Sequence, residues 1–218
     1  DHSVAYDFGP AFGLFSPARD SIDGAFRRHQ KDTFDVAVIS HRAADHAGGL
    51  ASVESRLKGS KIFSGEPVNN GDQRCVFPMR WRFDGVEFRF LNLSNFQFRE
   101  DNNKSCVLHI KGKYGTALFT GDLERPAEVA LSHFYGHELR ADVMQIPHHG
   151  SHSSSSTLFL SKVNPKLGIL SRGLNNRYGH PSESVVSRYR QREIRILDTA
   201  QVGQIDLVSR ESGWDETT

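Results

Sequence analysis

Three short segments of this chain place residues that can bind metal directly after apolar stretches. Imidazole nitrogens and carboxylate oxygens together suit Zn²⁺ or Mn²⁺, and carboxylate-rich sets favour Mn²⁺. A single histidine is more often a hydrogen-bonded structural residue, but three such segments in a chain with 11 histidines favour a metal centre. The residues concerned are His41, Asp45 and His46 in segment 40–49, Asp122 in segment 119–122, and His148 and His149 in segment 146–151.

Strands that end just before these segments must position them. Short apolar runs predict buried strands at 35–40, 116–120 and 143–146. Loops at strand ends are held by a rigid scaffold and stay open to substrate. Gly48 and Gly49 let the backbone pass close to an ion or a phosphate, and a helix that begins just after the first segment's histidines would direct its N–H groups toward an anion.

The rest of the chain alternates short strands and helices without a linker or a repeat. We therefore predict that residues 1–218 form a single domain of the α+β or layered α/β class, with sheets covered by helices. The clearest hairpin pairs 79–83 with 86–90 around Asp84 and Gly85. The predicted helices are 21–31 with Ser21 as its cap, 50–57 before Gly59, 127–134 behind Pro126, and 184–191. Further strands are predicted at 106–110, 167–171, 194–198 and 204–209.

The composition is that of an ordinary globular protein, with 37% hydrophobic and 24% charged residues. No apolar run approaches the roughly 20 residues that cross a bilayer, and the N-terminus, which lacks Met, does not look like a signal peptide. A net charge of +1 says little about nucleic acid, and the arginine clusters at 80–82 and 188–195 are explained as solvated faces. For Cys75 and Cys106 we predict two buried thiols, with a single disulfide as the open alternative.

The three ligand-bearing segments resemble the metallo-β-lactamase superfamily, whose signature is His-x-His-x-Asp-His after a strand, then Gly-Asp and a later His. Within the superfamily, the chain is most similar to the C-terminal, nuclease-type domain of the ComEC family of DNA-uptake competence proteins. The segments that carry this resemblance are 6–10, 40–49, 102–108, 120–122, 147–156 and 176–181. They cover almost the whole chain.

The resemblance implies an αββα sandwich with two neighbouring ion sites. The family opens with a strand carrying Asp-Val-Gly-Gln-Gly, which is absent here, so we expect a domain without its first strand that is a fragment of a larger membrane protein. Residue by residue, one site would use Asp45, His46 and a histidine of the pair His148 and His149. The other would use His41, position 43 and a residue near Asn102 or Asn103, and Asp122 would bridge the two ions.

Position 43 departs from the family pattern. It holds Ala43, where the ComEC family has Asp and the wider superfamily has His. An alanine methyl group has no lone pair, so the site of His41 is expected to be weak or absent while the other site is intact. One sequence leaves open whether this alanine is natural or engineered.

The activity implied by the resemblance is hydrolysis of DNA phosphodiester bonds with divalent ions, Mn²⁺ first and Zn²⁺ as the alternative, without a small-molecule cofactor. Asp45 would orient the attacking water, His180 would protonate the leaving group, and Asn103 would position the substrate. The residues expected to contact backbone phosphates are Ser151, Ser153 and Arg177.

The resemblance also implies a place in the cell. The domain would belong to a bacterial inner-membrane protein, would lie on the periplasmic or extracytoplasmic side beside the channel part of the same polypeptide, and would degrade the DNA strand that is not transported during natural transformation. One alternative is a catalytically inactive module that binds or guides DNA, which Ala43 favours. The other is a small-molecule hydrolase of the same superfamily, which the motifs at 148–151 and 176–181 disfavour.

Overall fold

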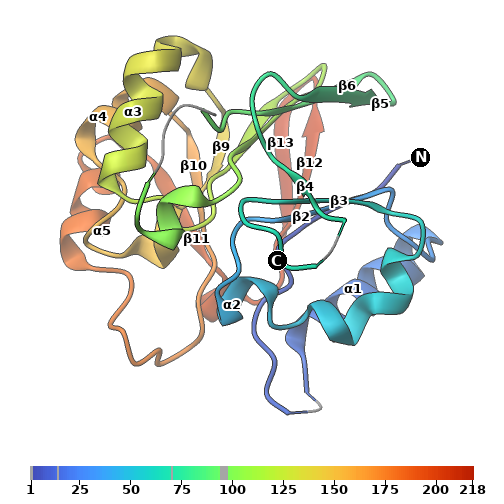
Figure 1. Cartoon of the computed structure of the whole chain (residues 1–218). Coiled ribbons are helices and arrows are strands. Elements are labelled where there is room, and N and C mark those ends of the chain that lie inside the picture. Colours follow the sequence, from blue (N-terminus) through green and yellow to red (C-terminus); the bar gives the residue numbers. More distant parts are fainter. Residues whose placement is uncertain (1, 14, 70, 94–97) are drawn as a thin grey trace.

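The computed structural model describes residues 2–13, 15–69, 71–93 and 98–218. Two main sheets lie against each other, and helices cover their outer faces (Figure 1). The smaller sheet is parallel, and its strands run in the order β1 (Val4–Tyr6), β2 (Val36–Ile39), β3 (Lys61–Ser64) and β4 (Gln73–Arg74). The helical segments of this half are α1 (Pro17–His29), α2 (Ala44–Ala47) and the 3₁₀ helix η1 (Leu50–Leu57).

The larger sheet has seven strands and is mixed. Antiparallel pairs join β5 (Arg80–Phe83), β6 (Val86–Phe90), β7 (Leu108–Lys111) and β8 (Thr116–Phe119). Parallel pairs then join β8 to β9 (Val143–Gln145), β10 (Leu167–Leu170) and β11 (Arg195–Asp198). The helical segments of this half are η2 (Asp101–Lys104), α3 (Arg125–Tyr135), η3 (Gly136–Leu139), η4 (Pro147–Gly150), α4 (Thr157–Val163) and α5 (Glu183–Arg190). The chain ends with α6 (Thr199–Val202) and the hairpin β12 (Asp206–Arg210) and β13 (Gly213–Thr217).

Three apolar clusters fill the spaces between the layers. Successive side chains of a strand point to opposite faces, so β2 serves two clusters. Val36 and Val38 join Phe90 and Leu108 between the sheets, whereas Ala37 and Ile39 pack with residues of α1 and η1. A third cluster joins the outer face of the larger sheet to α3, α4 and α5. The predicted layered sandwich is therefore confirmed. Among the described residues, no helix is both long and apolar enough to cross a bilayer.

Most predicted elements are present, and the largest difference in a boundary is at the start of the first helix. The 79–90 hairpin, the 106–120 strand pair, the strands at 143–146, 167–171, 194–198 and 204–209, and the helices at 127–134 and 184–191 all have counterparts. The helix predicted at 21–31 begins instead at Pro17, with Ser16 and not Ser21 at the N-cap position. Proline suits this position because its fixed φ matches the helix and its missing N–H costs no hydrogen bond there.

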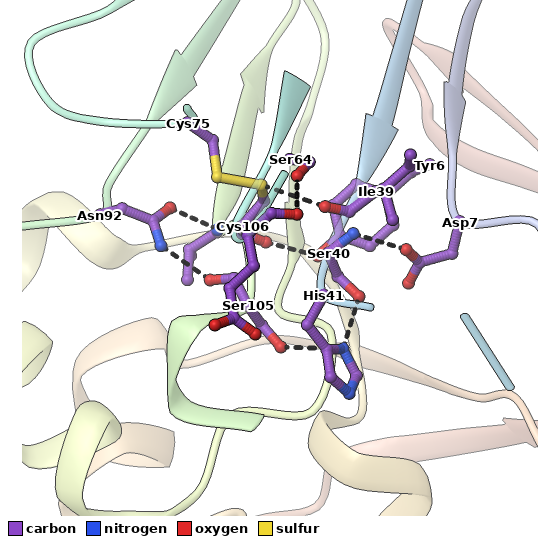
Figure 2. Close-up of a disulfide and its surroundings, with 12 residues drawn as sticks. Tyr6, Asp7, Ile39, Ser40, His41, Ser64, Cys75, Asn92, Ser105 and Cys106 are labelled. Atoms are coloured by element: carbon purple, nitrogen blue, oxygen red, sulfur yellow. Dashed lines mark hydrogen bonds between the residues drawn. A yellow bond between two sulfur atoms is a disulfide. The ribbon is translucent and has the colours of Figure 1, made fainter. Parts of the chain in front are cut away.

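The prediction of two free thiols is wrong, because Cys75 and Cys106 form a disulfide with a Cα–Cα distance of 5.7 Å (Figure 2). Strand order brings the two residues together. Cys75 follows β4 and donates its backbone N–H to Ser64 at the end of β3, and Cys106 precedes β7 and donates its N–H to the carbonyl of Ser40. A separation of 31 residues in the chain gave no sign of this proximity.

Candidate metal centre

The candidate ligands meet where β2, β8 and β9 end. His41 follows β2, Asp122 follows β8, and η4, with His148 and His149, follows β9. Strands β8 and β9 are parallel neighbours, so their carboxyl ends lie at the same edge of the larger sheet. Ser105, which precedes β7, reaches this edge as well, because β7 runs antiparallel to β8.

Four of these residues form a compact group. One potential ligand atom from each of Asp45, His46, Asp122 and His149 lies within 4.8 Å of every other. Asp122 Oδ1 is 3.0 Å from His46 Nε2 and 3.6 Å from His149 Nε2, and Asp45 Oδ2 is also 3.6 Å from His149 Nε2. Two imidazoles and two carboxylates at this spacing can enclose one divalent cation.

The Nε2 atoms around this group lack hydrogen-bond partners. Those of His41, His46 and His149 are all buried without one, and the contact of His46 Nε2 with Asp122 does not have hydrogen-bond geometry. Buried polar atoms are normally satisfied, so three such nitrogens at one place need an explanation. A cation that accepts their lone pairs provides it, and the residues present therefore fit a metal ion.

The other nitrogen of each ring is engaged, which fixes the orientation of the ring. His46 Nδ1 lies 2.7 Å from Asp7 Oδ2, and His149 Nδ1 lies 2.7 Å from the carbonyl oxygen of Ser171. His41 Nδ1 lies 3.1 Å from Ser40 Oγ (Figure 2). Metal-binding histidines usually have such a partner on the second nitrogen, which directs the first toward the ion.

Burial and charge determine the protonation of the group. Burial alone would lower the pKa of His46, but its contacts with Asp122 and Asp7 outweigh this and raise the pKa to about 10. The close approach of His149, whose Nε2 lies 3.6 Å from Asp45 Oδ2, is the main reason that the pKa of Asp45 is well below its usual range. Burial lowers the pKa of His41, and the neighbouring charge of His46 lowers it further. His41 is thus neutral at pH 7, as a ligand must be.

Asp122 faces histidines on two sides. Its Oδ1 is directed to His46 and His149, whereas its Oδ2 lies 3.6 Å from His148 Nε2. His148 Nδ1 lies 3.2 Å from Glu124 Oε1. This carboxylate therefore stands between two sets of imidazoles, the place expected of a residue that bridges two ions.

Ala43 stands at the N-cap of α2, immediately before the helix that carries Asp45 and His46. On the other side of Asp122, Asn102 Nδ2 lies 3.5 Å from His148 Nε2. Beside His148 and the second oxygen of Asp122, the side chain at position 43 offers no ligand atom.

Three residues of the centre have unusual backbone conformations. Asp7, His148 and His149 have φ values of 60°, 49° and 51°, in the left-handed region that non-glycine residues seldom adopt. Such strain tends to cluster at functional sites, where the surrounding structure compensates for it. At Gly121, φ is +53° and a Cβ would lie 2.7 Å from the Cβ of Ser40, so only glycine fits before Asp122.

Three predicted residues lie behind the ligands. Asn103 is buried, and its Oδ1 accepts the backbone N–H of Glu124. Ser153 Oγ donates to Glu124 Oε1 at 2.9 Å and lies 3.4 Å from His148 Nδ1, and Ser151 Oγ is 3.1 Å from Ser153 Oγ. These contacts indicate that the three residues help to position Glu124 and His148, and they give less support to direct contact with a substrate.

The two remaining predicted residues lie on the loop after β10. The ring of His180 is 5.8 Å from that of His148, within reach of a substrate at the centre. Arg177 is exposed and donates to the hydroxyl of Tyr178, so in this structure it does not contact the ligand group.

Sequence reasoning assigned no role to four residues that hold the ligands. Asp7 orients His46, Ser40 and Ser105 lie beside His41, and Glu124 lies beside His148. Two of them could have been found from the sequence. Asp7 lies in segment 6–10, which carries the family resemblance, and Glu124 lies two residues after the predicted ligand Asp122. The two serines had no such signal apart from being next to motif residues.

Comparison with known proteins agrees with this geometry. Residues 20–173 match the family model of the metallo-β-lactamase superfamily. The competence protein ComA of Neisseria gonorrhoeae is 38% identical over 79% of this chain, and recombination protein 2 of Haemophilus influenzae is 31% identical over 93%. The metallo-β-lactamase-fold protein YhfI of Bacillus subtilis superposes with a TM-score of 0.54 at 11% identity, over 91% of this chain and 84% of that one.

The chain therefore belongs to the metallo-β-lactamase superfamily, the class of metal-dependent hydrolases that the layered fold and the His and Asp cluster define. It spans about a quarter of the length of the two curated relatives, 25% of one and 26% of the other.

Proposed function

We propose that this domain hydrolyses DNA phosphodiester bonds with divalent ions, Mn²⁺ in the first instance, and degrades the strand that is not transported during DNA uptake. The observation that best supports metal-dependent hydrolysis is the group of Asp45, His46, Asp122 and His149 with its unpartnered Nε2 atoms. The names of the two relatives, a competence protein and a recombination protein, favour DNA as the substrate.

The side chains have separate parts in this reaction. A divalent ion in the group would supply Lewis-acid stabilisation of the charge that develops on the phosphoryl oxygens. Asp45, whose side chain is half exposed, would orient the attacking water, and its ionised carboxylate suits that task. His180 would donate a proton to the leaving oxygen. Burial, followed by the charges of His148 and His149, lowers the pKa of His180, so this donation would be strongest on the acidic side of pH 7.

Ala43 favours a second candidate function, a DNA-binding module that guides a strand without cutting it. The group of Asp45, His46, Asp122 and His149 has all its expected ligands in this chain, whereas position 43 offers no ligand to a second ion. Two-ion catalysis uses the second ion to stabilise the leaving or attacking oxygen. Loss of that ion would reduce cleavage strongly and leave binding to the phosphates intact.

We also propose that the domain lies on the extracytoplasmic side of the inner membrane, beside the channel part of the same polypeptide. The Cys75–Cys106 disulfide supports this placement, because disulfides persist in oxidising compartments and are rare in the cytosol. A nuclease on that side would meet incoming DNA before one strand crosses.

Cleavage of end-labelled single-stranded and duplex DNA with Mn²⁺ tests the proposal, with this chain beside Ala43→Asp. We expect Ala43→Asp to cut at least about tenfold faster, because it restores a ligand for the second ion. Asp122→Asn in both backgrounds is the control and should abolish cutting.

Three other results would decide against the nuclease. If neither form cuts but both bind DNA, the guiding module replaces it. If a lactone or lactam is hydrolysed and DNA is not, the domain is a small-molecule hydrolase. If neither form cuts or binds DNA or a small substrate, the assignment has no support beyond the fold.

A further inference from the structure

Two exposed loops carry large hydrophobic side chains beside the metal centre. In the Phe12 loop (9–16, described except for residue 14), Phe12 and Phe15 are 65% and 54% exposed. In the Tyr178 loop (171–181), Leu174 and Tyr178 are 71% and 64% exposed. These are four of the five most exposed large hydrophobic side chains among the described residues, and apolar patches of this kind mark binding surfaces.

Each loop is attached directly to the ligand group. The Phe12 loop begins two residues after Asp7, which holds His46, and the carbonyl of Gly9 accepts the N–H of Gly49 at 2.8 Å. The Tyr178 loop begins at Ser171, whose carbonyl oxygen accepts from His149. It ends next to His180, whose ring lies 5.8 Å from that of His148. Both loops extend on the same side of the molecule, to either side of α2 (Figure 1).

Residues of both loops also contact one another within their own loop. Phe12 and Phe15 exchange backbone hydrogen bonds of 2.8 and 3.1 Å, which tie these two residues to each other. The ring of Tyr178 lies 5.9 Å from that of His180 with an interplanar angle of 18°, and Arg177 lies over the Tyr178 ring and donates to its hydroxyl. The exposed aromatic residues therefore have local partners that hold them, and a cation lies beside Tyr178.

This combination suits an unpaired nucleic-acid strand. Proteins bind single strands by stacking bases on aromatic side chains and by placing arginine or lysine near the phosphates. In a duplex the base faces are already stacked on one another and are unavailable to an aromatic ring. A membrane surface fits less well, because insertion of both loops would place the bilayer across the metal centre between them and exclude a polymeric substrate.

We infer that the Phe12 and Tyr178 loops stack unpaired nucleobases on both sides of the metal centre, so that the substrate is a single DNA strand drawn across it. The inference rests on the proposed nuclease function and adds the form of DNA and the residues that select it. Stacking is carried by Phe12, Phe15 and Tyr178, and Arg177 contributes charge for a neighbouring phosphate.

Fluorescence anisotropy tests this with a labelled oligothymidylate, an abasic strand of the same length and a DNA hairpin duplex, in chelator so that nothing is cut. Each stacked base that is lost should weaken binding roughly tenfold. We expect Tyr178→Ala and Phe12→Ala each to lower affinity for the oligothymidylate by about that factor. Their affinity for the abasic strand and the duplex should not change. Phe134→Ala is the control, because Phe134 is 58% exposed on α3, outside both loops.

Equal losses on the base-bearing and abasic strands, or no loss at all, would overturn the inference. So would a loss confined to binding of anionic phospholipid vesicles, which would assign the loops to a membrane surface. Hydrolysis of bis(p-nitrophenyl) phosphate with Mn²⁺ tests the nuclease separately, because this small diester has no base and no strand. If the diester is hydrolysed but DNA binding does not depend on the bases, the stacking inference is wrong and the nuclease proposal stands. If DNA binding depends on the bases but neither this chain nor Ala43→Asp hydrolyses the diester, the nuclease proposal is wrong and the stacking of bases stands.

Discussion

The carboxylate of Asp7 lies 2.7 Å from Nδ1 of His46, and Asp122 lies 3.0 Å from Nε2 of the same ring. The second oxygen of Asp7 accepts the backbone N–H of Ser40 at 2.6 Å. A single residue after the first strand thus fixes both the start of the ligand segment 40–49 and the orientation of one ligand in it. The parallel pairing of β1 with β2, with Tyr6 opposite Val38, brings it there.

Substitution Asp7→Ala should weaken metal binding without removing a ligand. Loss of the carboxylate leaves Ser40 Oγ, 3.1 Å away, as the remaining partner of His46 Nδ1, so the ring is held less firmly. Removal of such outer partners typically costs about 10- to 100-fold in metal affinity. Titration calorimetry with Mn²⁺ measures this. Asp23→Ala is the matched control, because Asp23 of α1 pairs with Arg56 of η1 and not with a candidate ligand. An unchanged affinity in Asp7→Ala would show that Asp7 has no part in the centre.

The number of bound ions should depend on position 43. We expect this chain to bind one divalent ion tightly, in the group of Asp45, His46, Asp122 and His149, and the Ala43→Asp variant to bind two. Elemental analysis after dialysis against Mn²⁺ counts them. Ala44→Asp controls for added charge, because residue 44 is exposed and adjacent but is outside the ligand pattern. Two tightly bound ions in the unchanged chain would mean that His41 and His148 suffice with other ligands.

Local patterns in the sequence were enough to predict the strands that end at the centre and to mark the candidate ligands that the structure brings together there. His46 and Asp122 belong to short motifs, and their positions after apolar strands already imply a shared sheet edge. The role of Asp7 was not predictable in the same way. It depends on the pairing of β1 with β2, in which paired residues are 32 positions apart in the sequence. The family resemblance of segment 6–10 included Asp7, but it did not indicate that Asp7 contacts His46.

Other contacts were hidden for the same reason. Ser151 and Ser153 were predicted to hydrogen-bond a backbone phosphate, which stays a prediction, but nothing local indicated their hydrogen bonds toward Glu124 and His148. The cysteines were predicted to be free because neither lies near a partner along the chain. In both cases the missing information was tertiary, namely which segment lies behind another.

Loss of the disulfide should destabilise the domain and loosen the centre. Closing a loop of 31 residues stabilises a fold by about 3 to 4 kcal/mol in the chain-entropy model. Cys106 also accepts the hydroxyl of Tyr6 on its carbonyl, and it adjoins Ser105, whose Oγ lies 3.4 Å from His41 Nδ1 (Figure 2). We therefore expect Cys75→Ser to lower the free energy of unfolding by about that amount.

Urea unfolding with and without a thiol reductant measures the disulfide's contribution. The reductant should destabilise the unchanged chain and leave Cys75→Ser unaffected, so the variant serves as its own control for side effects of the reagent. Equal stability of the two forms in oxidising buffer would contradict the estimate. Metal titration of Cys75→Ser then shows whether the disulfide supports His41 or only the sheets.

Stability should fall in mild acid because of His109, which is far from the ligands in the chain. The residue is buried on β7, and its Nε2 lies 2.9 Å from the carbonyl oxygen of Arg140. Burial lowers the pKa of His109, and the nearby charge of Arg89 adds to this, although the hydrogen bond to Arg140 opposes it. The folded state thus disfavours the imidazolium, which the unfolded chain forms near its ordinary pKa of 6.5.

The sign follows from which state binds more protons. Below about pH 6.5 the unfolded chain takes up a proton that folded His109 resists, so this residue's contribution is complete above that pH and is lost as the pH falls toward its folded pKa. One proton limits the slope to about 1.4 kcal/mol per pH unit. Urea unfolding between about pH 5.5 and 7.5 should therefore show a shallower decline for His109→Gln than for the unchanged chain, while His152→Gln, at an exposed position, should follow the unchanged chain. Parallel curves for all three proteins would assign the acid sensitivity to other groups.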